Sequence, residues 1–417
     1  MLHQENAPAF CSAPSDSPDH EARIDALPGG STCLGELPDR RLFLKTLAVP
    51  CAAACAMAVS RNCFASAAWP GAAADEDDSR FRIEARFYEK LPDKMVRCKL
   101  CPRECVVADR SRGHCRVREN RNGTYFTVVH SRLVAVHIDP IEKKPFFHFL
   151  PGNMALSVAT AGCNVNCKFC QNWEISQAKP EDIPAKFLPP KELATAAGEN
   201  HCAAVAFTYS EPTVFNEYVT DAAEAARAAG VKSIVVSNGF IQQAPMMRVC
   251  QHVDAIKIDL KAYSPDYYRN VVDGQLQPIL DTMVTVRKHA PWMEIVYLVV
   301  PTLNDRDAEV RDMARWIKAE LGPDVPIHFT RFMPLYRLQN LPPTPVQTLE
   351  RLKAVADAEG LQYVYIGNIP GHPAENTYCP KCHQLLIERA GFTIKQMNLR
   401  KGKCPGCQHA IPGVWQS

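Results

Sequence analysis

The sequence has no surplus of charge of either sign and no long apolar run. Its 417 residues include 47 basic and 45 acidic side chains, a formal net charge of +2. Proteins that bind the phosphate backbone carry clustered positive charge, so this balance argues against a nucleic-acid partner. No uncharged apolar stretch reaches the roughly 18 residues that a membrane-spanning helix needs, which argues against a membrane span.

Cysteine is abundant, and most cysteines fall into groups. Of the 18 cysteines, eleven form three groups: Cys98, Cys101, Cys105 and Cys115; Cys163, Cys167 and Cys170; and Cys379, Cys382, Cys404 and Cys407. Disulfide scaffolds are usually short secreted chains, and this chain is long, so the groups indicate metal ligands. Cys202 and Cys250 stand alone in apolar or helical stretches and are expected to be ordinary core residues.

Residues 1–80 differ in composition from the rest of the chain. They are rich in Ala, Pro, Ser and Asp, and they contain "DRRLFLKTLAVPCAAACAMAVS" followed by Ala65-Ser66-Ala67. This pattern resembles a twin-arginine export signal, which we favour over a disordered extension. Such a signal implies assembly in the cytoplasm and export of the folded protein.

Residues 151–375 alternate apolar strand-like runs with amphipathic helical stretches. This alternation predicts a parallel sheet, and a partial (β/α) barrel is preferred over a doubly wound sheet because polar candidates follow several strands at one mouth. The class is therefore α/β, with a cysteine-rich module at 81–150 and a zinc-ribbon-like module at 376–417. The expected strands are 156–160, 203–208, 232–237, 255–260, 294–300, 326–332 and 361–366, with two more at 125–131 and 133–139.

The central group, in "ATAGCNVNCKFCQNW", lacks a fourth ligand. A structural zinc site needs four ligands, and neither His nor Cys follows within the loop. The spacing C-x3-C-x2-C, with Phe169 before the last cysteine, resembles that of the radical S-adenosylmethionine (SAM) superfamily. The resemblance implies a [4Fe-4S] cluster on Cys163, Cys167 and Cys170, whose fourth iron binds SAM. Phe169 and Trp173 are expected to bury this cluster.

Polar residues near the ends of the later strands complete a predicted SAM pocket. "FTYSEPT" stands where the superfamily has a Gly-Gly-Glu turn, although the glycines are absent here. Taken alone, Asp259 could cap a helix and His328 could be a core residue. The residues assigned to cofactor binding are Tyr209, Ser210, Glu211, Ser237, Asn238, Asp259, Lys261, His328 and Asn368.

The two outer groups each supply four thiolates. In the first, "CKLCPRECVVADRSRGHC", the spacing suits zinc or an auxiliary iron–sulfur cluster and does not separate them; the tight turns favour structural zinc. In the second, "CPKC" and "CPGC" enclose 21 residues, a spacing close to that of a zinc ribbon. Zinc is expected there, because it can replace a core too small to fold alone.

Further motifs narrow the resemblance. "DPIEKKPFFHFLPG", "TYSEPTVFNEY" and "YVYIGN" occur in order with the cysteine groups. Together they resemble the radical SAM component of the AmmeMemoRadiSam system, related to pyruvate formate-lyase activating enzymes. The resemblance implies AMMECR1-type and Memo-type partners, an electron donor such as flavodoxin or ferredoxin, and radical modification of a protein. Two alternatives remain: a radical SAM enzyme that acts on a small molecule, and a non-catalytic iron–sulfur electron carrier.

Overall fold

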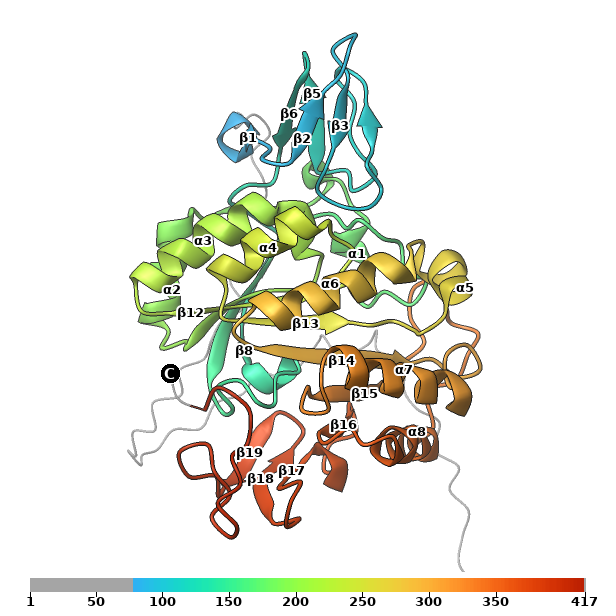
Figure 1. Ribbon diagram of the computed structural model, residues 1–417. Helices are drawn as coiled ribbons and strands as arrows, with labels where there is room; N and C mark the ends of the chain where they lie inside the picture. Colours follow the sequence, from blue (N-terminus) through green and yellow to red (C-terminus); the bar gives the residue numbers. More distant parts are fainter. Residues whose placement is uncertain (1–77, 416–417) are drawn as a thin grey trace, which may run out of the picture. The chain divides into compact units, whose positions relative to one another are not determined.

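An eight-stranded sheet is the centre of the computed structural model, which describes residues 78–415 (Figure 1). Its strand order is β16-β15-β14-β13-β12-β11-β9-β8, and all neighbours are parallel except β8 and β9. The strands are β8 (Ala135–Pro140), β9 (Met154–Ala159), β11 (Ala204–Phe207), β12 (Lys232–Ser237), β13 (Ala255–Asp259), β14 (Met293–Val299), β15 (Ile327–Arg331) and β16 (Val364–Gly367). The seven strands predicted between 156 and 366 are thus confirmed, in a mostly parallel sheet typical of a partial barrel.

Helices connect the parallel strands. The longer ones are α2 (Pro190–Glu199), α3 (Asn216–Ala228), α4 (Gln243–His252), α6 (Leu276–His289), α7 (Asp307–Glu320) and α8 (Val346–Ala358). Short elements lie between them: α1 (Trp173–Ser176), α5 (Pro265–Tyr267), the π-helix η5 (Tyr268–Val272) and the 3-10 turns η3 (Pro180–Asp182) and η4 (Pro212–Phe215). Gly230 follows α3 with φ +75°, a conformation that glycine adopts without steric cost. No helix in residues 78–415 is long and apolar enough to cross a membrane.

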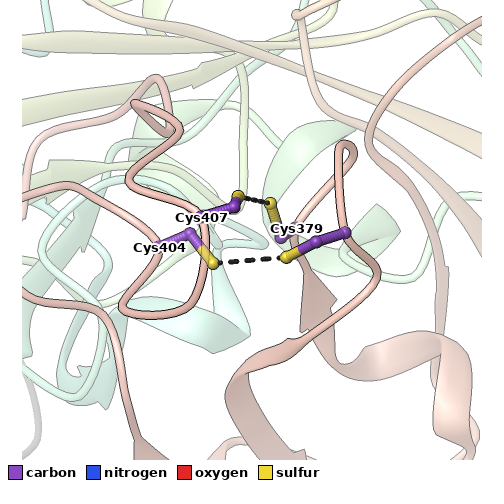
Figure 2. A group of neighbouring side chains, drawn as sticks. Cys379, Cys404 and Cys407 are labelled. Atoms are coloured by element: carbon purple, nitrogen blue, oxygen red, sulfur yellow. Dashed lines mark hydrogen bonds between the residues drawn. The ribbon is translucent and has the colours of Figure 1, made fainter.

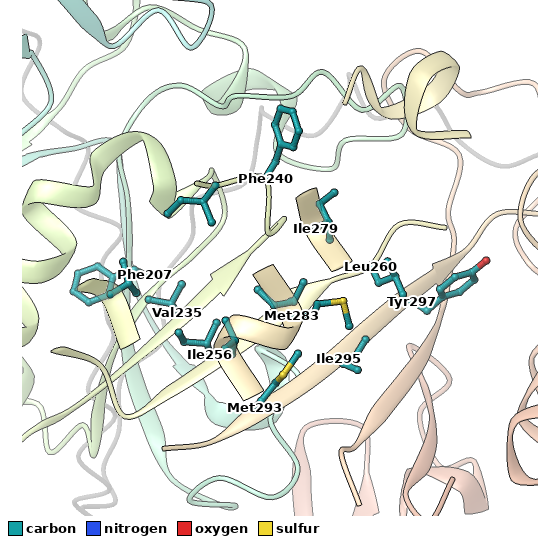
Figure 3. Close-up of a cluster of buried hydrophobic side chains, with 14 of the residues drawn as sticks. Phe207, Val235, Phe240, Ile256, Leu260, Ile279, Met283, Met293, Ile295 and Tyr297 are labelled. Atoms are coloured by element: carbon teal, nitrogen blue, oxygen red, sulfur yellow. The ribbon is translucent and has the colours of Figure 1, made fainter. Parts of the chain in front are cut away.

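The sheet is buried on both faces, and its two faces differ. On β11, Val205 and Phe207 belong to the large cluster shared with the helices, whereas Ala204 and Ala206 face a smaller cluster with Phe146. Successive side chains of a strand point to opposite faces, so this alternation defines an outer and an inner side. Figure 3 shows part of the outer cluster, where side chains of the strands meet those of α6.

The N-terminal region forms small antiparallel sheets. One contains β1 (Ile83–Glu84), β6 (Thr124–Thr127) and β5 (Arg118–Arg121), and another contains β2 (Tyr88–Lys90), β3 (Val96–Cys98) and β4 (Val106–Val107). A 3-10 turn, η1 (Asp78–Phe81), precedes them, and β7 (Arg132–Leu133) pairs with β10 (Lys186–Phe187). The strand predicted at 133–139 appears as β8, but it pairs with β9 in the main sheet, although the sequence places it in the N-terminal module.

The C-terminal region contains a three-stranded sheet of β17 (Thr377–Tyr378), β18 (Leu385–Ala390) and β19 (Thr393–Met397). Its core includes Cys379 and Cys404 together with Phe147, Tyr363 and Tyr365, so it packs on the segments around β8 and β16. The 3-10 turns η2 (Ile141–Lys143) and η6 (Pro373–Glu375) lie in these connections. The predicted export signal falls outside the described residues.

Candidate active site

The central cysteines lie on the loop that leaves β9 at its carboxyl end. Backbone bonds fix this loop to the π-helix η5: Asn166 N donates to Val272 O (3.0 Å) and Lys168 N to Val271 O (2.9 Å). Gly162, directly before the first cysteine, has φ +96° and no room for a side chain. The loop is therefore held at several points before any cofactor binds.

The three thiols open into a cavity of about 500 Å³ at the carboxyl end of the sheet. In the described part of the chain, the residues that line it include no fourth cysteine and no histidine. Burial raises the pKa of the Cys163 thiol well above its usual value and that of Cys167 to about 12. Metal ligation requires the thiolate, so loading this site releases protons. Three thiols beside an open cavity, with Cys167 buried and Cys163 and Cys170 half-buried, fit a cluster that leaves one iron without a protein ligand.

Seven of the nine predicted cofactor residues line this cavity: Tyr209, Ser210, Glu211, Asn238, Asp259, Lys261 and Asn368. The Oγ atom of Ser210 is buried and has no hydrogen-bond partner among the described residues. A buried polar atom without a partner is costly in a folded protein, so a ligand atom at this position would be favoured. This is the clearest sign of a polar ligand in the cavity.

Both carboxylate oxygens of Glu211 accept hydrogen bonds from other residues of the protein. Its Oε1 accepts hydrogen bonds from Thr213 N (2.9 Å) and Ser237 Oγ (2.7 Å), and its Oε2 accepts one from Asn238 N (2.8 Å). Burial raises its pKa, and these donors partly offset that effect. Glu211 and Ser237 therefore join the loops after β11 and β12 and act as positioning residues.

Tyr209 adopts φ +65°, the region that glycine favours. The missing glycine is thus replaced by a residue in a glycine-like conformation. The Tyr209 hydroxyl donates to Asp139 Oδ2 and accepts from Lys144 Nζ (3.3 Å), and its ring packs edge-on to His137. These contacts hold the strained backbone and connect the turn to β8.

Asp259 lies between two lysines. Its Oδ1 is 2.7 Å from Lys257 Nζ and its Oδ2 is 2.8 Å from Lys261 Nζ. Burial opposes ionisation of Asp259, but the two ammonium groups outweigh it and hold its pKa below the usual value. The side-chain amide of Asn238 reaches Cys163 Sγ at 3.8 Å and Asn164 Oδ1 at 2.9 Å. The cavity therefore has fixed charges and amide groups directly beside the thiols.

Comparisons with known proteins agree with this geometry. A family model described as the radical SAM superfamily matches residues 157–317, which include the central cysteines. An uncharacterized protein of Methanocaldococcus jannaschii is 44% identical over 330 residues, covering 79% of this chain and 98% of that protein. The chain belongs to the radical SAM superfamily.

Other radical SAM relatives are more distant. The pyruvate formate-lyase-activating enzyme of Clostridium pasteurianum is 23% identical over 163 residues, covering 38% of this chain and 66% of that enzyme. Among solved structures, a radical SAM methyltransferase from Sphaerobacter thermophilus has a TM-score of 0.42 and 16% identity, covering 54% of this chain and 71% of that chain. The protein is a radical SAM enzyme similar to activating enzymes, and its family implies a [4Fe-4S] cluster and SAM.

His328, predicted in the SAM pocket, does not line the cavity. On β15 it shares a face with Thr330, which does line it, but lies two residues deeper in the sheet. Its ring is fully buried, and Nε2 lies 2.8 Å from Glu294 Oε2. Glu294 also accepts from the backbone N–H groups of Phe147 and His148, so this network ties the segment before β9 to the sheet. His328 is a core histidine, the alternative that its sequence context left open.

Trp173 also differs from expectation. Phe169 is buried, as predicted, but Trp173 is 41% exposed and stacks on Tyr336 with ring centroids 5.2 Å apart. Trp173 begins α1, just after Asn172, which lines the cavity. Its ring therefore belongs to the rim of the site rather than to the surroundings of the cluster.

Several lining residues escaped prediction: Lys143, Lys144, Lys257 and Phe392. Lys257 could have been found, because it precedes Asp259 by two residues on β13 and so shares its face. Lys144 lies in the motif "DPIEKKPFFHFLPG", to which the sequence alone assigns no role. Burial lowers the pKa of Lys144 to about 8, and the nearby Asp139 partly offsets this effect. Phe392 lies between β18 and β19, so the C-terminal module contributes to this cavity.

The C-terminal cysteines form a four-thiol metal site. All four Sγ atoms lie within 4.8 Å of one another, with Cys379 to Cys407 and Cys382 to Cys404 both at 3.5 Å (Figure 2). Thiolates that share one tetrahedral zinc, each at about 2.3 Å, are separated by roughly 3.8 Å. The predicted grouping of Cys379, Cys382, Cys404 and Cys407 is therefore confirmed.

The N-terminal cysteines have a different arrangement from the C-terminal ones. Cys98 and Cys101 are buried, and Cys98 N donates to Cys105 O at 2.9 Å. Burial raises the pKa of Cys101 to about 12, with further contributions from the charges of Cys98, Cys105 and Cys115. Among the described residues, these thiols do not reach the short mutual distances of the C-terminal site, so their role as metal ligands stays a prediction.

Proposed function

We propose that this radical SAM enzyme abstracts hydrogen from a protein partner, which it activates or modifies. The observation that carries the proposal is a cavity whose lining, among residues 78–415, has three thiols but no fourth cysteine and no histidine, together with a buried Ser210 hydroxyl that has no hydrogen-bond partner there. When bound, the cluster and SAM supply a 5′-deoxyadenosyl radical, the reagent for hydrogen abstraction. The protein's own residues orient the cofactor and exclude water.

Each cavity residue has a separate part in this proposal. Cys163, Cys167 and Cys170 would hold the cluster, and Asn238 would donate to the Cys163 sulfur. Ser210, Asp259, Lys261 and Asn368 line the cavity and would bind the polar parts of SAM. Glu211 and Ser237 would act indirectly, by fixing the loops that carry Ser210 and Asn238.

A protein substrate is supported by the surface around the cavity. Four large apolar side chains there are at least 41% exposed: Trp173, Met333, Leu335 and Phe392. Trp173 and Phe392 adjoin or line the cavity, and the segment of Met333 and Leu335 reaches the cysteine loop through Arg337 N, which donates to Lys168 O at 2.9 Å. Exposed apolar groups around an active site favour protein docking. We name these four residues the apolar rim.

The partners, the electron donor and the C-terminal metal are proposed from the resemblance to the radical SAM component of the AmmeMemoRadiSam system. We propose AMMECR1-type and Memo-type proteins as partners, a flavodoxin or ferredoxin as electron donor, and zinc at Cys379, Cys382, Cys404 and Cys407, where the sulfur separations are those of a single-ion site. The twin-arginine signal and cytoplasmic assembly stay predictions, because they rest on residues that the structure does not describe.

The test is SAM cleavage by the anaerobically reconstituted, reduced protein. We expect wild-type protein to form 5′-deoxyadenosine and Cys167→Ala to form at least about 100-fold less, because one iron loses its ligand. Cys202→Ala is the matched control: it removes a buried thiol outside the cysteine groups and should retain cleavage. Cleavage retained by Cys167→Ala would refute the cluster assignment.

A second assay separates a protein substrate from a small molecule. Candidate partner proteins and a protein-free small-molecule extract are added separately to the reduced enzyme with SAM. Stimulated 5′-deoxyadenosine formation by a partner, with deuterium transfer from deuterated partner into the product, supports the proposal. Stimulation by the extract alone supports the alternative. If a partner protein stimulates the reaction, Met333→Ser should lower the rate of 5′-deoxyadenosine formation with the partner more than the rate without it.

A further inference from the structure

The N-terminal cysteines differ from the C-terminal ones in how far apart their sulfurs lie. Within residues 78–415, the C-terminal group alone brings three or more ligand atoms within 4.8 Å of one another. No three of Cys98, Cys101, Cys105 and Cys115 therefore meet the spacing at which thiolates share one zinc ion.

The central group gives an internal reference for this spacing. Cys163, Cys167 and Cys170 also stay outside the 4.8 Å grouping among the described residues, and their family implies a [4Fe-4S] cluster. In such a cluster each thiolate binds its own iron, so the sulfurs are farther apart than those around a single ion. The N-terminal group thus follows the pattern of the cluster-binding site.

We propose that Cys98, Cys101, Cys105 and Cys115 bind a second [4Fe-4S] cluster, which passes electrons to the cluster of the active site. This differs from the structural zinc that the sequence favours. The inference deepens the proposed function and rests on it for the role of the second cluster, but the binding of iron at these residues stands on their own geometry.

The N-terminal site contacts the loop that carries the central cysteines. A Cβ atom on Gly162 would lie 2.7 Å from Cys115 O and 2.6 Å from Val117 Cγ1, so the two cysteine loops touch at the residue before Cys163. Arg103, between Cys101 and Cys105, donates from Nε to Asn164 O at 2.6 Å. Both contacts join segments that directly flank the ligands of the two sites.

A buried arginine supplies positive charge beside the N-terminal thiols. Arg118 is fully buried, and its charge acts on Cys98 and Cys115. Its two terminal nitrogens bind the carboxylate of Glu217, and its Nε has no hydrogen-bond partner among the described residues. A cluster with four thiolate ligands is anionic, so a nearby guanidinium with a free N–H stabilises it.

The electron step balances without proton transfer. A one-electron donor of the flavodoxin or ferredoxin type is oxidised by one electron, and the N-terminal cluster is reduced from the 2+ to the 1+ state. The same electron then reduces the central cluster from 2+ to 1+ and returns the N-terminal cluster to 2+. Each transfer moves one electron and breaks no bond.

The experiment measures iron, zinc and electron paramagnetic resonance (EPR) spectra of the reconstituted full chain. We expect about eight irons per chain in the wild type and about four in the variant Cys163→Ala/Cys167→Ala/Cys170→Ala. About four irons should also remain in Cys98→Ala/Cys101→Ala. The fully reduced wild type should show a spin-coupled EPR signal, and each variant an uncoupled signal from one cluster.

Other results overturn the inference. If the central triple variant holds no iron and about two zinc ions, the N-terminal site is a zinc site. If the wild type holds eight irons but the central cluster of Cys98→Ala/Cys101→Ala is reduced as fast as that of the wild type, the second cluster is not the electron partner. Neither readout requires SAM cleavage, so failure here is distinct from failure of the proposed function. Circular dichroism of each variant identifies loss of folding.

Discussion

The two outer cysteine groups have the same number of thiols and opposite geometries. At the C-terminal end, two knuckles bring four sulfurs within 4.8 Å of one another, and this site contributes to a small core with Tyr363 and Tyr365. At the N-terminal end, the thiols are spread over β3 and the loops that follow, and they border the cysteine loop of the active site. This difference is the basis of our proposal that one module binds a stabilising ion and the other a redox cluster.

Both modules share apolar core residues with the barrel, and the N-terminal module is attached by a buried ion pair as well. The C-terminal module shares apolar core residues with the sheet. The N-terminal module contributes Val117 and Val129 to the large core, and it is also joined to α3 by the fully buried ion pair of Arg118 and Glu217. Burial alone would raise the Glu217 pKa, and the Arg118 charge outweighs it and lowers the pKa. Breaking each attachment should therefore have a different consequence.

The largest effect is expected from Arg118→Met. This change leaves Glu217 buried without its partner, and removing one member of a buried pair costs about 3–5 kcal/mol. Guanidinium-induced unfolding measures the loss. Arg97→Met is the control, because the Arg97–Glu89 pair is exposed and worth at most about 1 kcal/mol. Equal effects of the two changes would show that the buried pair does not anchor the module.

A comparable but local effect is expected from Cys382→Ser. Loss of one ligand should release the C-terminal metal and destabilise that module by about 3 kcal/mol or more, because metal binding supplies its folding energy. Zinc analysis and limited proteolysis report the two consequences. Iron content should not change. A variant that keeps its stability without metal would contradict a structural role for this site.

Gly162→Ala should weaken the contact between the N-terminal and central sites. The residue has φ +96°, and the added methyl group would meet Cys115 O at 2.7 Å, so we expect a cost of about 2 kcal/mol and weaker iron retention. Gly230→Ala is the matched control, with φ +75° and no atom within 4 Å of the added group. Iron loss on dialysis measures the difference; similar retention in both variants would argue against close packing of the two loops.

The smallest effect concerns Lys144, which belongs to neither cysteine module. Burial lowers its pKa to about 8, so between pH 8 and its usual pKa near 10.5 the unfolded chain binds more protons than the folded chain. Stability from this group therefore increases as pH rises through that range and is lowest below pH 8. Relative to Lys144→Met, the wild type should gain about 1 kcal/mol between pH 7 and pH 9. A constant difference in unfolding free energy would show that Lys144 titrates normally.

Local sequence patterns predicted the strands and the cysteine groups because both depend on nearby residues. They could not predict how far along a strand a side chain lies from the cavity at the carboxyl end of the sheet. His328 and Thr330 share a face of β15, yet only Thr330 reaches the cavity, because pairing with β14 decides which residue lies at the mouth. Ser237 was assigned to the cofactor, but its hydroxyl binds Glu211, a contact between two loops that no single segment reveals.

The spacing of cysteines along the sequence also could not predict which metal the N-terminal and C-terminal groups bind. Four cysteines along the chain suit zinc or iron, and the distances between their sulfurs depend on how the chain folds, which spacing in the sequence does not give. The contribution of Phe392 to the cavity could not be predicted either, because a residue of the C-terminal module contacts the active site only in the folded chain.

The most direct test of this account is anomalous X-ray diffraction from crystals of the reconstituted protein, recorded on both sides of the iron and zinc absorption edges. We predict iron peaks at Cys163, Cys167 and Cys170 and at Cys98, Cys101, Cys105 and Cys115, with a zinc peak at Cys379, Cys382, Cys404 and Cys407. A zinc peak at the N-terminal group, or no iron at the central group, would contradict it.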